Sequence, residues 1–177
     1  HAPLFHPAMK NVAPIRKELG VKTFFNMLGP MVNPAFPKNQ LVGVFDLELA
    51  RMYGYLYQKS EKNYAVLHAM DGYDEISLTG PVKVISKNSE NILTAKDFAV
   101  KQIENSEIFG GETVKESSEI FLNILNGKGT LAQNNVVCAN AGMAISVVEN
   151  CTIKDGFEKA KESLLSGKGL NSLRKLQ

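Results

Sequence analysis

The stretch Gln40-Leu41-Val42-Gly43-Val44-Phe45-Asp46 decides the fold expected for this chain of 177 residues. Its apolar part, residues 41–45, is short and continuous, which is typical of a strand buried on both faces. Asp46 is suited to cap a helix, and apolar residues recur after it at helical spacing as far as Leu56. A second short apolar run, Tyr64 to His68, follows a polar turn. Strand, helix and strand in this order predict a βαβ unit with two parallel strands and a right-handed crossover.

The sequence after this unit predicts a hairpin and then helices. Val82 to Ser86 and Ile92-Leu93 are expected to form two antiparallel strands, because a polar turn separates them. Four further stretches show helical periodicity: Thr113–Leu125, Thr130–Val148, Ile153–Leu165 and Leu170–Leu176. Because Thr130–Val148 is apolar nearly all round, we expect it to run buried through the core. The predicted fold class is α/β, with a mostly parallel central sheet surrounded by helices.

The first forty residues differ from the rest, because they hold six of the seven prolines. Proline fixes the backbone and cannot donate a hydrogen bond, so this segment is expected to be rigid and irregular. Pro14 fits the first position of a short helix that runs to Leu19 and is capped by Gly20. We therefore divide the chain into a proline-rich segment, 1–39, and an α/β domain, 40–177.

Composition excludes several classes of protein. The 20 Lys and Arg against 18 Asp and Glu give a net charge of +2, which argues against a nucleic-acid partner. The longest apolar stretch, Val136 to Val148, has thirteen residues and is interrupted by polar ones, whereas a bilayer span needs about 20. We therefore expect no membrane partner. Two cysteines without CxxC spacing, Cys138 and Cys151, favour a reducing compartment and a cytoplasmic location.

The sharpest chemical signal is Asp71-Gly72-Tyr73-Asp74-Glu75, directly after the second predicted strand. Ligands of open α/β sheets bind beyond the carboxyl ends of strands, and carboxylate oxygens suit a hard cation such as Mg²⁺. Asp74 and Glu75, being adjacent, suit an ion that keeps its waters and bridges to substrate phosphates. The alternative interpretation is an Asp-Gly turn followed by solvated acids, and spacing alone favours that alternative.

A second signal is basic, and other features have structural interpretations. His6, Lys10, Asn11, Arg16 and Lys17 cluster in the proline-rich segment, where a fixed guanidinium could hold a carboxylate or phosphate; such clusters are more often a solvated helix face. The glycine pairs at 127/129 and 167/169 are better explained as helix ends than as phosphate loops. His68 is expected to be a core histidine. The sequence shows no nucleophile with an obvious base, so an enzyme of this kind would work by positioning and electrostatics.

Read together, several ordered stretches resemble the anthranilate phosphoribosyltransferases of tryptophan biosynthesis. The stretches that carry the resemblance are Ala2-Pro3 with His6-Pro7-Ala8-Met9-Lys10, Val12 with Pro14-Ile15-Arg16-Lys17-Glu18-Leu19-Gly20, Thr23 with Phe25-Asn26-Met27-Leu28-Gly29-Pro30, Asn33-Pro34-Ala35, Gln40-Leu41-Val42-Gly43-Val44, His68 with Asp71-Gly72-Tyr73-Asp74-Glu75-Ile76-Ser77, Gly110-Gly111 and Asn140-Ala141. The first two blocks are specific to this family within its superfold, whereas the Gly-Gly and Asn-Ala pieces are weak alone.

The resemblance implies a fold like the C-terminal domains of nucleoside phosphorylases and phosphoribosyltransferases. It also implies a glycosyltransferase that joins the amine of anthranilate to C1 of phosphoribosyl pyrophosphate, with Mg²⁺ as cofactor. Asp74 and Glu75 would help to bind the metal and pyrophosphate, and Arg16 would meet the anthranilate carboxylate. His6 and Pro30 would form walls of the anthranilate tunnel, with Gly29 and Asn26 supporting the tunnel or hinge. The resemblance thus implies that segment 1–39 is a hinge and substrate-wall segment.

The resemblance further implies that the family's glycine-rich phosphate loop and N-terminal helices would precede His1. We therefore expect a full-length homodimer, and a chain that is inactive alone and lacks the expected dimer surface. Two other functions stay open. A pyrimidine nucleoside phosphorylase would share the fold, although the block from Asn26 to Pro34 favours the transferase. A noncatalytic nucleic-acid-binding relative would need a strongly basic surface, which a charge of +2 hardly supports.

Overall fold

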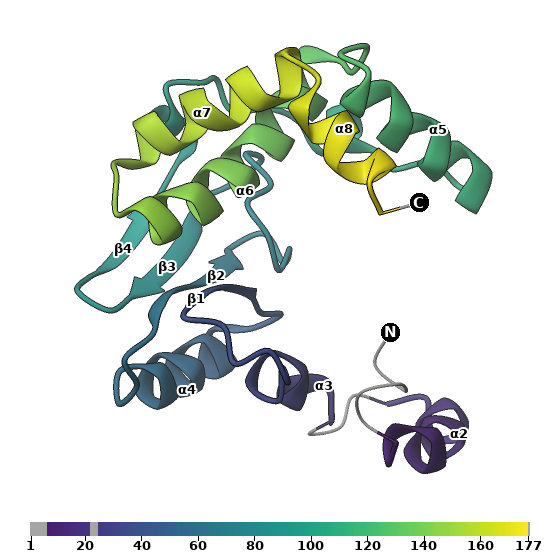
Figure 1. Cartoon of the computed structure of the whole chain (residues 1–177), viewed down its shortest axis with the longest axis vertical. Helices are drawn as coiled ribbons and strands as arrows, with labels where there is room; N and C mark the ends of the chain where they lie inside the picture. Colours follow the sequence, from purple (N-terminus) through teal and green to yellow (C-terminus); the bar gives the residue numbers. More distant parts are fainter. Residues whose placement is uncertain (1–6, 22–24, 177) are drawn as a thin grey trace. The chain divides into compact units, whose positions relative to one another are not determined.

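The computed structural model describes residues 7–21 and 25–176. The chain separates into two compact units, His1–Lys38 and Asn39–Gln177. The elements of both units are labelled in Figure 1.

The described part of the first unit is helical. It contains α2 (Met9–Leu19), α3 (Phe25–Leu28) and the short 3-10 helix η1 (Gly29–Met31). The helix α2 ends as predicted at Gly20, which has a φ of +61° and donates its N–H to the Arg16 carbonyl at 3.2 Å. Its start was predicted wrongly, because Pro14 lies inside α2 and not at its first position. The fixed φ of proline is compatible with a helix, and turn bonds such as Lys10 N–H to the Pro7 carbonyl (3.1 Å) begin the helix earlier.

The second unit is built on a mixed sheet. Within the described residues this sheet has four strands in the order β1 (Asn39–Gly43), β2 (Asn63–Ala69), β3 (Val82–Ser86) and β4 (Glu90–Leu93). The first pair is parallel, with Gln40 opposite Tyr64, and α4 (Leu47–Tyr57) is its crossover helix. The predicted βαβ unit is therefore confirmed. Asp46 caps α4, since its carboxylate accepts the N–H of Leu49 at 2.7 Å.

The α/β class is confirmed, but the sheet is not mostly parallel in the described residues. The β2–β3 and β3–β4 pairs are both antiparallel, so the predicted hairpin is present, and among the described strands only β1 and β2 pair in parallel. The reason lies in the connections. A helix joins β1 to β2, whereas β2 returns to β3 through the irregular segment 70–81, which carries no crossover helix.

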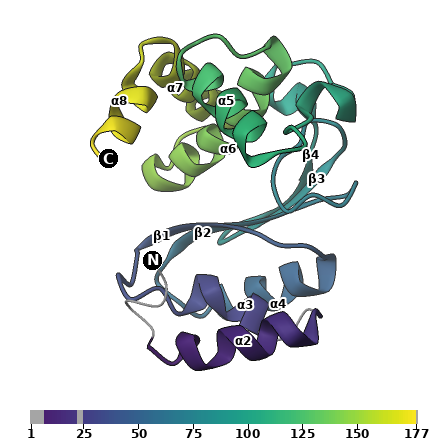
Figure 2. The ribbon, with the colours of Figure 1, turned by 90° about the vertical axis from the view of Figure 1, so that its right-hand side faces the viewer.

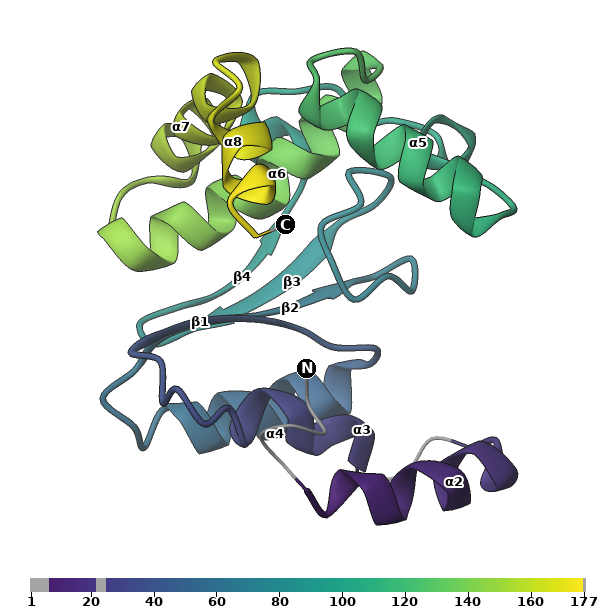
Figure 3. The same ribbon diagram turned by 45° about the vertical axis from the view of Figure 1, so that its right-hand side comes forward.

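Helices cover both faces of this sheet, as Figures 2 and 3 show. The helix α4 packs on β2 and β3, and α6 (Leu131–Glu149) packs on β1 and β2 from the opposite side. The remaining elements are η2 (Ala95–Phe98), η3 (Asn105–Ile108), α5 (Val114–Leu125), α7 (Ile153–Leu165) and α8 (Lys168–Arg174). This cover explains why Tyr64–Ala69 of β2 are all buried, as their apolar run predicted.

The helix α6 is buried on one side and not all round. Cys138, Ala139 and Met143 are among its buried residues, whereas Val137 and Val148 are 38% and 58% exposed. On the buried side α6 lies very close to α7, because a Cβ at Gly142 would lie 2.7 Å from the backbone of Phe157. The prediction of a fully buried helix is therefore wrong within this unit.

In the described ranges, no single helix is long and apolar enough to cross a bilayer; α6 and α7 meet that test only as a pair bent by 118°.

Candidate functional site

The predicted acidic site lies in the loop 70–81, beyond the carboxyl end of β2. The loop begins with a tight turn, in which Gly72 takes a φ of +100° and donates its N–H to the Ala69 carbonyl at 3.0 Å. Ala69 in turn donates its own N–H to the Tyr73 carbonyl at 2.9 Å. The Asp-Gly turn expected in the alternative interpretation is thus present, and it carries the chain directly into Asp74 and Glu75.

Gly43, the last residue of β1, lies against this loop. A Cβ added to Gly43 would lie 1.6 Å from the backbone oxygen of Asp74. Only a residue without a side chain leaves room for that oxygen. The parallel pairing of β1 and β2 therefore brings Gly43 against the backbone of the acidic pair.

A side chain of α6 forms hydrogen bonds with the residue that follows Asp74 and Glu75. The carboxamide oxygen of Asn140 accepts the N–H of Ile76 at 2.9 Å, and its nitrogen donates to the Ile76 carbonyl at 2.8 Å. The same nitrogen donates to the carbonyl of Val136, one turn earlier in α6, at 3.0 Å. Asn140 thus satisfies both backbone groups of a buried residue that directly follows Glu75.

Asp71 is engaged differently from the other two acids. Its carboxylate accepts hydrogen bonds from the hydroxyls of Ser77, at 3.4 Å, and of Thr79. Ser77 is 2% exposed, so this cluster fixes the middle of the loop. Asp71 therefore has a structural role, and the three carboxylates that spacing grouped together are not equivalent.

Asp74 and Glu75 are exposed on this fixed backbone. Their carboxylates are the oxygen ligands that Mg²⁺ prefers, and two of them leave coordination positions for water and for phosphate oxygens. Among the described residues, no group of three or more His, Cys, Asp and Glu side chains could hold a metal ion.

The other predicted site residues belong to the first unit. Arg16 is half-buried in the last turn of α2, where a cation is favourable beside the helix C-terminus. Asn26 lies in α3, and Gly29 and Pro30 lie in η1, which follows α3 directly. The structure thus brings these three together in consecutive turns. His6 lies outside the described residues.

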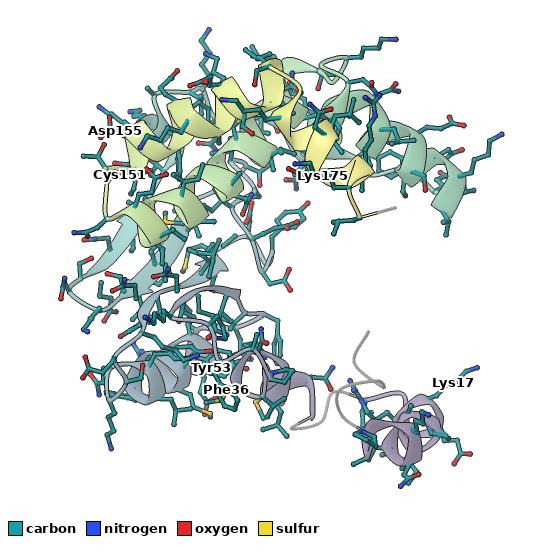
Figure 4. All side chains as sticks on the ribbon, viewed as in Figure 1. Lys17, Phe36, Tyr53, Cys151, Asp155 and Lys175 are labelled. Atoms are coloured by element: carbon teal, nitrogen blue, oxygen red, sulfur yellow. The ribbon has the colours of Figure 1, made fainter. Side chains whose placement is uncertain are left out.

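Other chemically interesting side chains have structural explanations. His68 is buried, and its Nδ1 lies 2.9 Å from the Val44 carbonyl, which confirms the expected core histidine. Burial raises the pKa of the Cys138 thiol, as expected of a small core residue. Figure 4 places Cys151 near Asp155 at the start of α7, where Thr152 caps the helix. Gly127 and Gly167 take φ values of +72° and +75° after helices, which confirms their interpretation as helix ends.

Sequence reasoning missed the residues that hold the loop. Asn140 was noted only as part of a weak motif, and Gly43 only as part of an apolar run. A local pattern does not connect Asn140 to Ile76, because they are 64 positions apart. An available signal was the position of Asn140 within the largely apolar stretch Val136–Val148, because a polar side chain in such a stretch usually has a specific hydrogen-bond partner.

Comparison with known proteins supports the resemblance found in the sequence. The family model described as "Glycosyl transferase family, a/b domain" matches residues 1–170. Curated proteins named anthranilate phosphoribosyltransferase are 67% identical to the chain in Flavobacterium johnsoniae and 69% identical in Christiangramia forsetii. Both matches cover all of this chain and 54% of the relative. The chain thus spans about half the length of the curated relatives it matches.

Solved structures agree with the sequence comparison. Anthranilate phosphoribosyltransferase from Thermus thermophilus superimposes with a TM-score of 0.87 at 30% identity, over 96% of this chain and 51% of that one. The Saccharomyces cerevisiae enzyme in complex with PRPP and Mg gives a TM-score of 0.84 at 29% identity, over 96% of this chain and 49% of that one. Sequence motifs, sheet topology and family match agree, and the chain belongs to the glycosyl transferase family, of which it carries the α/β domain.

Proposed function

We propose that the whole protein transfers the phosphoribosyl group of phosphoribosyl pyrophosphate to the amine of anthranilate, in tryptophan biosynthesis. Relatives of 67% and 69% identity carry the name of this activity. The yeast neighbours include complexes with PRPP and Mg and with 4-fluoroanthranilate, which supports the same two substrates here. The single observation in this chain that carries the proposal is the exposed pair Asp74–Glu75 on an anchored loop beyond β2.

Asp74 and Glu75 would bind Mg²⁺ together with the pyrophosphate of the substrate. Two exposed carboxylates beyond a strand end supply oxygen donors where α/β sheets bind ligands. When bound, Mg²⁺ would neutralise charge on the departing pyrophosphate. The anchored backbone would hold the two donors in place before the substrate arrives.

Arg16 would orient anthranilate through its carboxylate. A guanidinium offers two parallel N–H donors that match the two oxygens of a carboxylate, and a helix limits where the side chain can reach. His6 and Pro30 would form walls for the aromatic ring, with Gly29 and Asn26 supporting them. These assignments follow the family motifs that the sequence carries at these positions.

The chemistry proposed for these groups is positioning and charge stabilisation. The amine nitrogen forms a bond to C1 while the bond from C1 to the pyrophosphate oxygen breaks, and the amine gives up a proton. Such a transition state has oxocarbenium character, and a correctly held nucleophile and leaving group lower its free energy without a covalent intermediate. Carboxylates that hold a metal ion and a guanidinium that holds a carboxylate are groups that act in this way.

We also propose that the whole protein is a homodimer, as the family resemblance implies, and that it is cytoplasmic, as its two cysteines without CxxC spacing favour. Sedimentation of the whole protein at several concentrations tests its assembly.

The direct test of the activity uses the whole protein with phosphoribosyl pyrophosphate, anthranilate and Mg²⁺. We expect anthranilate to be consumed and pyrophosphate released in equal amounts, and both to stop when the metal is chelated. A parallel reaction with a pyrimidine nucleoside and inorganic phosphate tests the phosphorylase alternative. Phosphorolysis without anthranilate consumption would contradict the proposal.

A further inference from the structure

We infer that Asn140 is a positioning residue for the acidic pair, which it holds in its binding geometry through the backbone of Ile76. The inference rests on the proposed function of Asp74 and Glu75, and it adds a residue 65 positions away from Glu75 to their site. Its own observation is the paired hydrogen bonds between the Asn140 carboxamide and both backbone groups of Ile76.

A carboxamide is the group that this geometry requires. It carries one acceptor and one donor on a rigid plane, so it can pair with the N–H and the C=O of one residue as a neighbouring strand would. Ile76 is 1% exposed and lies outside the strands, where a sheet partner does not satisfy its backbone. The substitution Asn140→Asp would keep the acceptor and lose the donor.

These bonds act directly on the peptide that follows the acidic pair. The N–H of Ile76 and the carbonyl of Glu75 belong to one planar peptide unit, so the bond to Asn140 fixes the orientation of that plane. On the other side, the bond from Ala69 N–H to the Tyr73 carbonyl fixes the peptide that enters Asp74. Asp74 and Glu75 thus lie between two peptide planes whose orientations are fixed by hydrogen bonds.

The helix that carries Asn140 is itself held firmly. Its neighbours Ala139 and Met143 are 0% and 3% exposed, and the close approach of Gly142 to Phe157 locks α6 against α7. The bond from the Asn140 nitrogen to the Val136 carbonyl also limits rotation of the carboxamide. Asn140 therefore anchors an exposed loop to a firmly packed helix. A preorganised binding site requires such support.

The first experiment measures whether Asn140 anchors the loop. Hydrogen exchange resolved at the Ile76 amide is compared in the whole protein and in Asn140→Ala, Asn140→Asp and Asn134→Ala. Loss of the acceptor should speed exchange at Ile76 by about tenfold or more in Asn140→Ala. Asn140→Asp keeps an acceptor for that amide and should show a smaller change.

Asn134→Ala is the matched control. Asn134 lies on the same helix, but its nitrogen donates to the carbonyl of Gly129 and not to the loop. Exchange at Ile76 should stay within about twofold of the parent protein in this variant. Equal acceleration in Asn134→Ala and Asn140→Ala would mean general loosening of α6 and would overturn the inference.

The second experiment measures whether the anchor serves binding. Calorimetry with Mg²⁺ and inorganic pyrophosphate should show affinity about tenfold weaker in Asn140→Ala, since partners that orient ligating carboxylates typically change metal affinity by about 10-fold to 100-fold. The KM for anthranilate should stay within about twofold. Unchanged affinity, in a variant whose Ile76 amide exchanges faster, would overturn the positioning role.

The two proposals fail in different ways. If the parent protein binds Mg²⁺ and pyrophosphate in a manner sensitive to Asn140 but does not consume anthranilate, the proposed function is wrong and the positioning role stands. If the parent protein consumes anthranilate while Asn140→Ala and Asn140→Asp bind pyrophosphate as it does, the positioning role is wrong and the proposed function stands.

Discussion

Gly43 lies so close to Asp74 that a Cβ at position 43 would come within 1.6 Å of the Asp74 backbone oxygen. The end of β1 and the acidic loop after β2 are therefore in contact through backbone alone. Any side chain at position 43 must displace the backbone of the proposed metal ligand, because the obstructing atom is not the end of a flexible side chain.

We predict that Gly43→Ala shifts the loop and weakens binding of Mg²⁺ and pyrophosphate. Overpacking of this kind typically lowers the free energy of unfolding by about 1–3 kcal/mol. Urea unfolding and calorimetry of the whole protein measure the two effects. The control is Gly110→Ala, since a Cβ there meets nothing within 4 Å. Identical unfolding and binding in both variants would show that the loop tolerates the displacement.

We predict that the double substitution Asp74→Asn and Glu75→Gln lowers phosphoribosyl transfer by about 10-fold to 100-fold in the whole protein, because neutral amides bind Mg²⁺ more weakly than carboxylates. Both side chains are exposed, so the free energy of unfolding should change by less than about 0.5 kcal/mol. Steady-state kinetics and urea unfolding measure these. Glu61→Gln, an exposed acid before β2, is the matched control. Unchanged kinetics in the double variant would show that Asp74 and Glu75 do not take part in phosphoribosyl transfer.

We predict that Arg16→Ala raises the KM for anthranilate by about tenfold or more, because it removes a charge-assisted hydrogen-bond donor to the carboxylate. The KM for phosphoribosyl pyrophosphate should change much less. Lys17→Ala, in the same helical turn, controls for loss of a positive charge. An equal rise in the KM for both substrates would indicate a structural role for Arg16.

We predict that Tyr57→Phe is neutral or stabilises the protein by up to about 1 kcal/mol, because it removes a buried polar group that lacks compensation. Tyr57 is 4% exposed, and its hydroxyl finds no hydrogen-bond partner among the described residues. Thermal unfolding measures the difference. Tyr64→Phe is the comparison, since the Tyr64 hydroxyl donates to the Gly54 carbonyl at 3.5 Å. A clear loss of stability in Tyr57→Phe would contradict the burial argument.

We predict that ionisation of Tyr57 makes the free energy of unfolding depend on pH. Burial, and to a lesser degree the neighbouring Tyr53, raises the pKa of Tyr57 from 10.0 to about 12. The unfolded chain therefore loses this proton first as the pH rises above about 10, and stability falls between about pH 10 and 12. Urea unfolding at about pH 9 and about pH 11 should show a smaller loss in Tyr57→Phe than in the parent protein. An equal loss in both proteins would assign the dependence to other groups.

The amino-acid sequence by itself determined the strands and the longer helices of the second unit and their order. The apolar runs Leu41–Phe45 and Tyr64–His68 predicted β1 and β2, and helical spacing predicted α4 to α8, because these patterns reflect which face of each element is buried. The order of elements also located Asp74 and Glu75 beyond the end of β2. Pro14 was misplaced by local reasoning, since its effect on a helix depends on what precedes it.

Only the tertiary structure decided which acids are available and what holds them. Asp71, Asp74 and Glu75 lie within five residues and are all exposed, but the Asp71 carboxylate accepts hydrogen bonds from Ser77 and Thr79. Gly43 meets Asp74 because β1 pairs with β2, and Asn140 meets Ile76 because α6 packs across the same strands. Local sequence patterns encode the burial of single elements, but contacts between distant residues follow from how those elements pack. The position of the acidic pair beyond β2 could therefore be predicted from sequence, whereas the residues that support its loop could not.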